Sequence, residues 1–158
     1  MVNFRGFLRL IRIENLAILA IAQLALRYWL IKPLLSNSNI GFALNLSGFL
    51  MLMISVILIA AAGNAINDYF DIECDRYKNP QRAGYAIKHK NFILWFHHAA
   101  SFAGIAMGFY LAYNIGNVKL GFIQFLAVAL LWFYSVSYKR KVLTGNVVIA
   151  FLTVLAIG

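Results

Sequence analysis

A long uncharged and mainly apolar stretch runs from Gly41 to Ile66, and a cluster of acidic residues follows it closely. A helix that crosses the hydrocarbon core of a bilayer needs about 20 predominantly apolar residues, so this stretch predicts a transmembrane helix. The rest of the chain has the same character, because 63% of its 158 residues are hydrophobic, 12% are charged, and its mean hydropathy is +0.78. A soluble domain of this length has too little interior to bury so much apolar surface. We therefore predict an all-α fold, a polytopic bundle of transmembrane helices.

Apolar segments along the chain predict five spans, the last of them cut off where the sequence stops: 14–31, 40–69, 92–113, 120–138 and 145–158. Between them we expect an interfacial amphipathic segment at 1–13, a turn at 32–39 and a polar loop at 71–91. Arg27 lies near enough to the end of the first span for its long side chain to snorkel to the interface. The fifth segment is shorter than a full span, so we expect residues 1–158 to be the N-terminal part of a longer domain. The alternative is a short re-entrant final segment.

The net charge of +9 is distributed unevenly between the two predicted sides of the membrane. Eleven of the fourteen Lys and Arg residues fall in the N-terminal segment, the 71–91 loop and residues 139–141. Cytoplasmic loops carry the excess of basic residues, so we predict an integral, multi-pass protein of the cytoplasmic (inner) membrane, with its N-terminus and acidic loop in the cytoplasm. We expect no nucleic-acid partner, because the sequence lacks the interleaved basic and aromatic stripes of single-strand binders.

Four of the five acidic residues of the chain lie within residues 68–75. On a helix, Asn67, Asp71 and Asp75 are spaced four residues apart and therefore line one face, with Asp68 on the neighbouring stripe. Carboxylates beside an amide oxygen are hard ligands, and Mg²⁺ is held by one or two carboxylates together with water and substrate phosphate. The pattern indicates a Mg²⁺ site that would hold a diphosphate as its leaving group. The alternative is a solvated helix end whose carboxylates pair with the basic residues that follow.

Those basic residues are candidates for binding the same anion. Arg76, Lys78 and Arg82 follow the cluster directly, and Lys139 comes from another span on the same predicted side. Arginine forms bidentate contacts with phosphate, so such residues could hold a substrate that a metal bridges. Anchoring of the protein by the positive-inside rule explains the same positions and stays open as the alternative.

Three motifs resemble those of the UbiA-type intramembrane prenyltransferases. The first is Asn67-Asp68-x-x-Asp71-x-x-x-Asp75, continued by Arg76 and Asn79-Pro80-x-Arg82. The second is Arg12-x-x-Asn15, which is similar to the family's R-P-x-N element with Glu14 in place of proline. The third is Tyr134-Ser135-x-x-Tyr138-Lys139-Arg140 with Gly145-Asn146, which is similar to its Y-S-x-x-L-K-R and G-N stretch. The three motifs occur in the family's order along the chain.

The resemblance implies a UbiA-like bundle of nine spans, about five of them present here, around a cavity open to the cytoplasm and the bilayer. It implies transfer of a prenyl group from a prenyl diphosphate donor to a lipophilic acceptor in membrane lipid, with Mg²⁺ bound at two aspartate-rich motifs. The first motif would supply the catalytic and metal-binding residues Asn67, Asp71 and Asp75. Substrate and diphosphate would be bound by a second set: Asn15, Asp68, Arg76, Arg82, Tyr134 and Lys139. The second motif would lie beyond Gly158, so we expect the 158-residue chain alone to be inactive.

The run at residues 68–76 looks most like the branch of the family that prenylates geranylgeranylglyceryl phosphate. Lys78 and Ala83 depart from that branch, where Asn and Pro are common. Aromatic quinone precursors are the alternative acceptor class.

Two other function classes remain as alternatives to a prenyltransferase. A CDP-alcohol phosphotransferase also uses an acidic motif in the membrane, but it has Gly and Ala-Arg residues within a longer Asp pattern, and none follow Asp71. A transporter or channel would be expected to show inverted repeats, and no matching second half is visible. His97 and His98 point about 100° apart on a helix, so we predict packing or interface roles for them rather than one shared ligand site.

Overall fold

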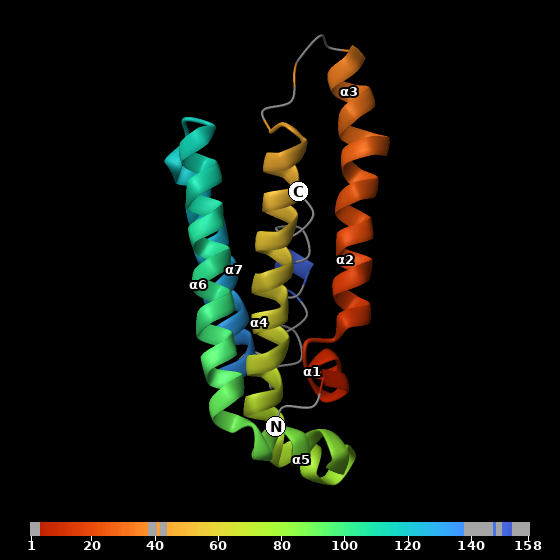
Figure 1. Cartoon of the computed structure of the whole chain (residues 1–158), viewed down its shortest axis with the longest axis vertical. Helices are drawn as coiled ribbons and strands as arrows, with labels where there is room; N and C mark the ends of the chain where they lie inside the picture. The colour runs from red at the N-terminus through yellow and green to blue at the C-terminus, as the bar shows by residue number, and fades with distance from the viewer. Residues whose placement is uncertain (1–3, 38–40, 42–43, 138–146, 148–149, 153–158) are drawn as a thin grey trace.

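The computed structural model describes residues 4–37, 41, 44–137, 147 and 150–152, and all the regular elements in these ranges are helical (Figure 1). The elements follow one another as α1 (Phe4–Leu10), α2 (Ile13–Ala25), the π-helical η1 (Leu26–Ile31), α3 (Lys32–Asn37), α4 (Leu46–Lys78), α5 (Pro80–Lys88), α6 (Lys90–Asn114), the 3₁₀-helical η2 (Val118–Leu120) and α7 (Gly121–Val136). The predicted all-α membrane-type bundle is confirmed.

Four continuous helical stretches are long and apolar enough to cross a membrane, namely Ile13–Asn37, Leu46–Lys78, Lys90–Asn114 and Val118–Val136. They correspond to the first four predicted spans. They run alternately up and down, so α1, α5 and the ends of α4 and α6 that adjoin α5 gather at one end of the bundle (Figure 1). The fifth predicted span, from Gly145 onward, falls almost wholly outside the described residues.

Two segments predicted as irregular are helical instead. Lys32–Asn37 continue the first span through Pro33, directly after the π-helical turn Leu26–Ile31, whose wider turn avoids the i→i−4 bond that proline cannot donate. The predicted polar loop at 71–91 is also wrong, because α4 continues to Lys78 and α5 follows after one break. Asn79 forms that break with φ −145° and ψ 75°, and proline is favoured at the first position of the next helix.

The centre of the bundle is α4, which packs against α2, α5, α6 and α7. Ile66 on α4 and Ile93 on α6 are fully buried, and Leu10 from α1 joins Ile93 in a buried cluster with Ile72 of α4. Ser55 donates a hydrogen bond of 2.8 Å to the carbonyl of Gly104 on α6. A side chain at Gly104 would run into Ile59 and the Ser55 carbonyl, so glycine there allows the two helices their close approach.

The prediction that the Arg27 side chain snorkels to the interface is wrong. Its side chain is buried, with only 8% of the residue exposed, and its guanidinium lies 4.5 Å from the ring centroid of Phe49 on α4. Nη2 also donates to the Leu44 carbonyl at 3.3 Å. A cation at this depth is costly unless protein groups satisfy it, and the Phe49 face and the carbonyl do so here.

His97 and His98 have the separate roles expected of neighbours on a helix. His97 is buried, its Nδ1 lies 3.1 Å from the Ala62 carbonyl, and its ring packs against Trp132 of α7. His98 is exposed. The buried histidine thus links α6 to both α4 and α7.

Candidate functional site

The acidic motif lies on the last three turns of α4, which carry it beyond the part of the helix that is needed to span a bilayer. Because α4 is continuous here, Asn67, Asp71 and Asp75 share one face, and all three side chains are partly buried. The amide Nδ2 of Asn67 donates to Oδ2 of Asp71 at 3.0 Å. This bond turns the Asn67 carbonyl oxygen away from the carboxylate, where it is free to accept from another group.

That carbonyl oxygen is the clearest sign that the face is suited to a cation. Oδ1 of Asn67 is buried, and the described part of the chain offers it no hydrogen-bond partner. Within the same described residues no three His, Cys, Asp or Glu side chains come together as a metal site. The face itself carries two carboxylates, Asp71 and Asp75, and the amide oxygen of Asn67. Such a partial set fits Mg²⁺, which fills its other positions with water and substrate phosphate.

Asp68 belongs to a different environment from the other acidic residues. It lies about 100° around α4 from Asn67, its side chain is 1% exposed, and its Oδ1 is 3.6 Å from Nη2 of Arg12. Arg12 sits between α1 and α2 with φ 55° and ψ 60°, a left-handed conformation that non-glycine residues rarely adopt. The Arg12–Asp68 ion pair therefore ties the α1–α2 junction to the acidic end of α4.

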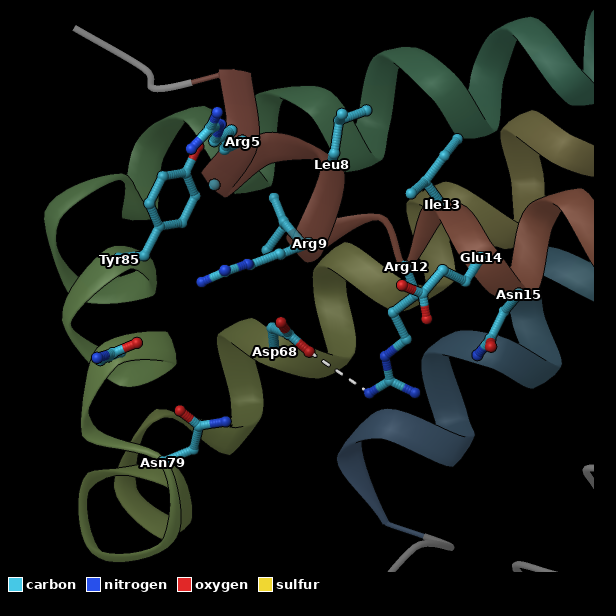
Figure 2. Close-up of a pocket in the computed structure, with 13 residues that line it drawn as sticks. Arg5, Leu8, Arg9, Arg12, Ile13, Glu14, Asn15, Asp68, Asn79 and Tyr85 are labelled. Atoms are coloured by element: carbon cyan, nitrogen blue, oxygen red, sulfur yellow. Dashed lines mark ion pairs between the residues drawn. The ribbon is translucent and has the colours of Figure 1, made fainter.

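A cavity of about 750 Å³ opens beside this ion pair, between α1, the start of α2, the end of α4, and α5 (Figure 2). Its polar and charged lining comes from four elements and the junctions between them: Arg5, Arg9, Arg12, Glu14, Asn15, Asp68, Asn79, Gln81 and Tyr85. We call this cavity the N-terminal pocket. Burial raises the pKa of Tyr85 above its ordinary value, so at neutral pH its side chain is a phenol that can donate a hydrogen bond.

The other predicted site residues lie at the same end of the bundle or outside the described structure. Asn15 lines the N-terminal pocket, and Arg76 is exposed on the last turn of α4. Tyr134 is near the end of α7, which the ring contact between Phe70 and Trp132 places beside α4. Two predicted groups cannot be placed, because the side chain of Arg82 and the whole of Lys139 lie outside what the structure describes.

The sequence reasoning missed the pocket-lining role of the N-terminal arginines and of Tyr85. Arg5, Arg9 and Arg12 recur at helical spacing, which indicated only an interfacial segment. The R-x-x-N element was a signal for Arg12, although only Asn15 was selected from it. Tyr85 carried no motif and is found only from its position on α5.

Comparison with known proteins defines the class to which this fold and site belong. A sequence profile of the UbiA prenyltransferase family matches residues 34–157. The chain belongs to the UbiA prenyltransferase family, as the sequence motifs suggested.

Its relatives narrow the resemblance further. The digeranylgeranylglyceryl phosphate synthase of Methanosarcina barkeri is 31% identical over 155 residues, covering 96% of this chain and 52% of that protein. The protein of the same name from Sulfolobus acidocaldarius is 26% identical and is covered over 51% of its length. A solved structure described as digeranylgeranylglyceryl phosphate synthase in membranes superposes with a TM-score of 0.77 at 27% identity, over 99% of this chain and 52% of that one. The chain thus spans about half the length of the curated relatives it matches.

Proposed function

We propose that the protein to which this chain belongs transfers a prenyl group from a prenyl diphosphate to a glycerol phosphate acceptor within the membrane. The observation that carries this proposal is the Asn67, Asp71 and Asp75 face at the end of α4, with its unpartnered amide oxygen, in a chain of the UbiA family. The names of the relatives favour a glycerol phosphate over an aromatic quinone precursor as acceptor. Family membership also favours a prenyltransferase over a CDP-alcohol phosphotransferase or a transporter.

The reaction breaks the bond between the allylic carbon of the donor and the diphosphate oxygen, and the bonding electrons leave with the diphosphate. The acceptor hydroxyl oxygen then bonds to that carbon and loses its proton. Proteins of this family generally use a divalent metal, and Asn67, Asp71 and Asp75 would hold it. A bound divalent ion, Mg²⁺ in this proposal, supplies charge that stabilises the leaving diphosphate.

The chain's own residues have two tasks in this reaction. The carboxylates of Asp71 and Asp75 keep a fixed spacing because both sit on one helix. They therefore position the donor diphosphate at the C-terminal end of α4. Arg76, one residue after Asp75 and exposed, is placed to contact the same anion. The apolar spans around the acidic face keep water away from the cationic allyl group.

We further propose that the end of the bundle bearing the acidic face lies in the cytoplasm. The described basic residues gather there: Arg5, Arg9, Arg12, Arg76, Lys78, Lys88 and Lys90. Only Lys32 and Lys119 lie toward the other end among the exposed basic residues that the structure describes. This asymmetry supports a cytoplasmic-membrane location with α1 and α5 inside.

Replacement of Asp71 or Asp75 by asparagine in the full-length protein tests the proposed function. We expect each change to lower prenyl transfer by about a hundredfold or more, because the variant loses a carboxylate that would hold the divalent ion, whose positive charge stabilises the leaving diphosphate. Glu73→Gln is the matched control, because Glu73 is an exposed carboxylate of the same segment on another face of α4. Transfer of a labelled prenyl group to a prenylglyceryl phosphate is the assay, and near-normal turnover of Asp71→Asn and Asp75→Asn would refute the metal-binding role.

A further inference from the structure

The N-terminal pocket does not include the α4 side chains of the proposed donor site in its lining. Asp68 is the α4 side chain that lines it, whereas Asn67, Asp71 and Asp75 do not. Its charged lining consists of three arginines against two carboxylates, Asp68 and Glu14, so one positive charge is left over. Because Arg12 pairs with the buried Asp68, that excess lies toward α1.

The pocket has a defined framework rather than being a gap between loose side chains. Arg12 holds a strained left-handed conformation that turns the chain from α1 into α2. A side chain at Gly6 would collide with the ring of Tyr85, so α1 lies directly against α5 at this point. Leu10 is buried in the cluster that contains Ile93 and Ile72, which fixes the C-terminal end of α1.

Several hydrogen-bond donors face this framework. In Figure 2 the Arg9 side chain extends from α1 across the hollow toward α5, between Asp68 and Tyr85. Nε of Arg12 is buried, and the described residues provide no acceptor for it. Tyr85 lines the same hollow, and its ring points toward Arg5 (Figure 2). Guanidinium groups and a phenol arranged in this way match the tetrahedral oxygens of a phosphate, which accepts hydrogen bonds from several directions.

We propose that the N-terminal pocket binds a phosphate monoester, the headgroup of the glycerol phosphate acceptor. Arg9 and Tyr85 contact the phosphate oxygens, and the Arg12–Asp68 pair positions the α1–α2 junction that presents them. Leu8 and Ile13 line the pocket beside these groups and give the glycerol and the start of the lipid chain an apolar surface. This inference rests on the proposed function, since it assigns the acceptor to a pocket next to the donor face.

Direct binding to the full-length protein in neutral detergent tests this assignment without turnover. The probes are geranylgeranylglyceryl phosphate and geranylgeranylglycerol, which differ only in the phosphate. We expect Arg9→Gln to weaken binding of the phosphate lipid by about tenfold or more and to leave binding of the alcohol unchanged. Lys88→Gln is the matched control, because it removes one positive charge at the same end of the bundle from a residue outside the pocket. Arg9→Lys, which keeps the charge, should recover most of the affinity.

Two further measurements separate the possible sources of the phosphate and the two proposals. Inorganic phosphate and phosphatidic acid micelles serve as competitors of the acceptor lipid. Competition that depends on Arg9 supports a phosphate monoester site. The relative strength of the competitors shows whether the pocket binds the acceptor lipid more tightly than other phosphate monoesters. Equal losses in Arg9→Gln and Lys88→Gln, or no loss in either, would overturn the assignment.

Binding of a non-hydrolysable prenyl diphosphate reports on the donor site alone. If that binding is absent while the Arg9 dependence persists, the proposed function fails and the pocket stands, and the reverse pattern removes only the pocket.

Discussion

The ion pair between Arg12 and Asp68 makes a quantitative prediction about how the N-terminal segment is held. Two unit charges 3.6 Å apart attract each other by about 5 kcal/mol at an effective dielectric constant of about 20. The Asp68 side chain is 1% exposed but that of Arg12 is 36% exposed, so water screens the pair substantially. We therefore expect a coupling free energy of about 1–2 kcal/mol, above the usual value for surface pairs and below the full Coulomb term.

A double-mutant cycle measures this coupling directly. Arg12→Gln leaves the buried Asp68 carboxylate without this cation, which should lower the free energy of unfolding by about 2 kcal/mol. Asp68→Asn removes the buried charge while keeping the shape of the side chain, so it should cost less. The double variant should then be less destabilised than the sum of the two single changes, because it no longer holds a buried carboxylate that has lost Arg12.

Unfolding in mixed micelles of sodium dodecyl sulfate and neutral detergent provides the assay. The same cycle with Arg9→Gln in place of Arg12→Gln is the control, because Arg9 lines the same pocket without an ion pair to Asp68 among the described residues. A coupling below about 0.5 kcal/mol between Arg12 and Asp68, or an equal coupling for Arg9, would refute the reasoning.

Three smaller predictions concern the packing of α1, α5 and the central helices. Because burial raises the pKa of Tyr85, the folded state holds the phenol proton more tightly than the unfolded state does. The free energy of unfolding should therefore be unaffected at neutral pH and fall as the pH rises above about 10. Thermal unfolding of Tyr85→Phe should show a smaller loss of stability at alkaline pH. Gly6→Ala should destabilise the contact of α1 with α5 by about 1–3 kcal/mol, whereas Gly84→Ala, which meets open space, should be close to neutral in the same unfolding assay. Ser55→Ala removes the buried hydrogen bond to Gly104 and should lower the unfolding free energy by about 1 kcal/mol, and an unchanged midpoint would argue against that bond.

The membrane-type fold could be predicted from hydropathy, but the ends of its helices could not. Apolar composition marks where a helix crosses the bilayer, and it located four stretches close to the observed spans. It carries no information about a helix that continues into polar surroundings, so α4 was expected to end nine residues before Lys78. The signal for α5 was present, since Ala83 and Ala86 are buried three residues apart beside exposed Lys88, and the polar composition of the segment hid it.

The two polar regions differ in how much of them local spacing can predict. The acidic face depends on neighbours four residues apart in one helix, so the positions of Asn67, Asp71 and Asp75 followed from periodicity. The N-terminal pocket depends on the left-handed backbone of Arg12 and on the approach of Gly6 to Tyr85, which is 79 positions further along the chain. Arginine is not a residue type that marks a left-handed turn, and a contact over that separation leaves no periodic signal.

The different environments of Asp68 and of the Asn67, Asp71 and Asp75 face have a consequence for the chemistry. A transferase that takes two phosphate-bearing lipids must bind two anions without exchanging them, yet it must bring their reacting ends together. Asp68 lies about 100° from Asn67 and only about 20° from Asp75 around the helix, but its carboxylate is buried against Arg12 whereas Asp75 is only partly buried. Arginine binds phosphate directly and a carboxylate face requires a cation, so the arginines of α1 and the α1–α2 junction and the acidic face of α4 offer two phosphate groups chemically distinct surfaces. The neutralising pair therefore matters to function, because an Asp68 carboxylate without Arg12 beside it would repel the phosphate that Arg9 attracts. Arg12→Gln should therefore weaken binding of the phosphate lipid more than Asp68→Asn does.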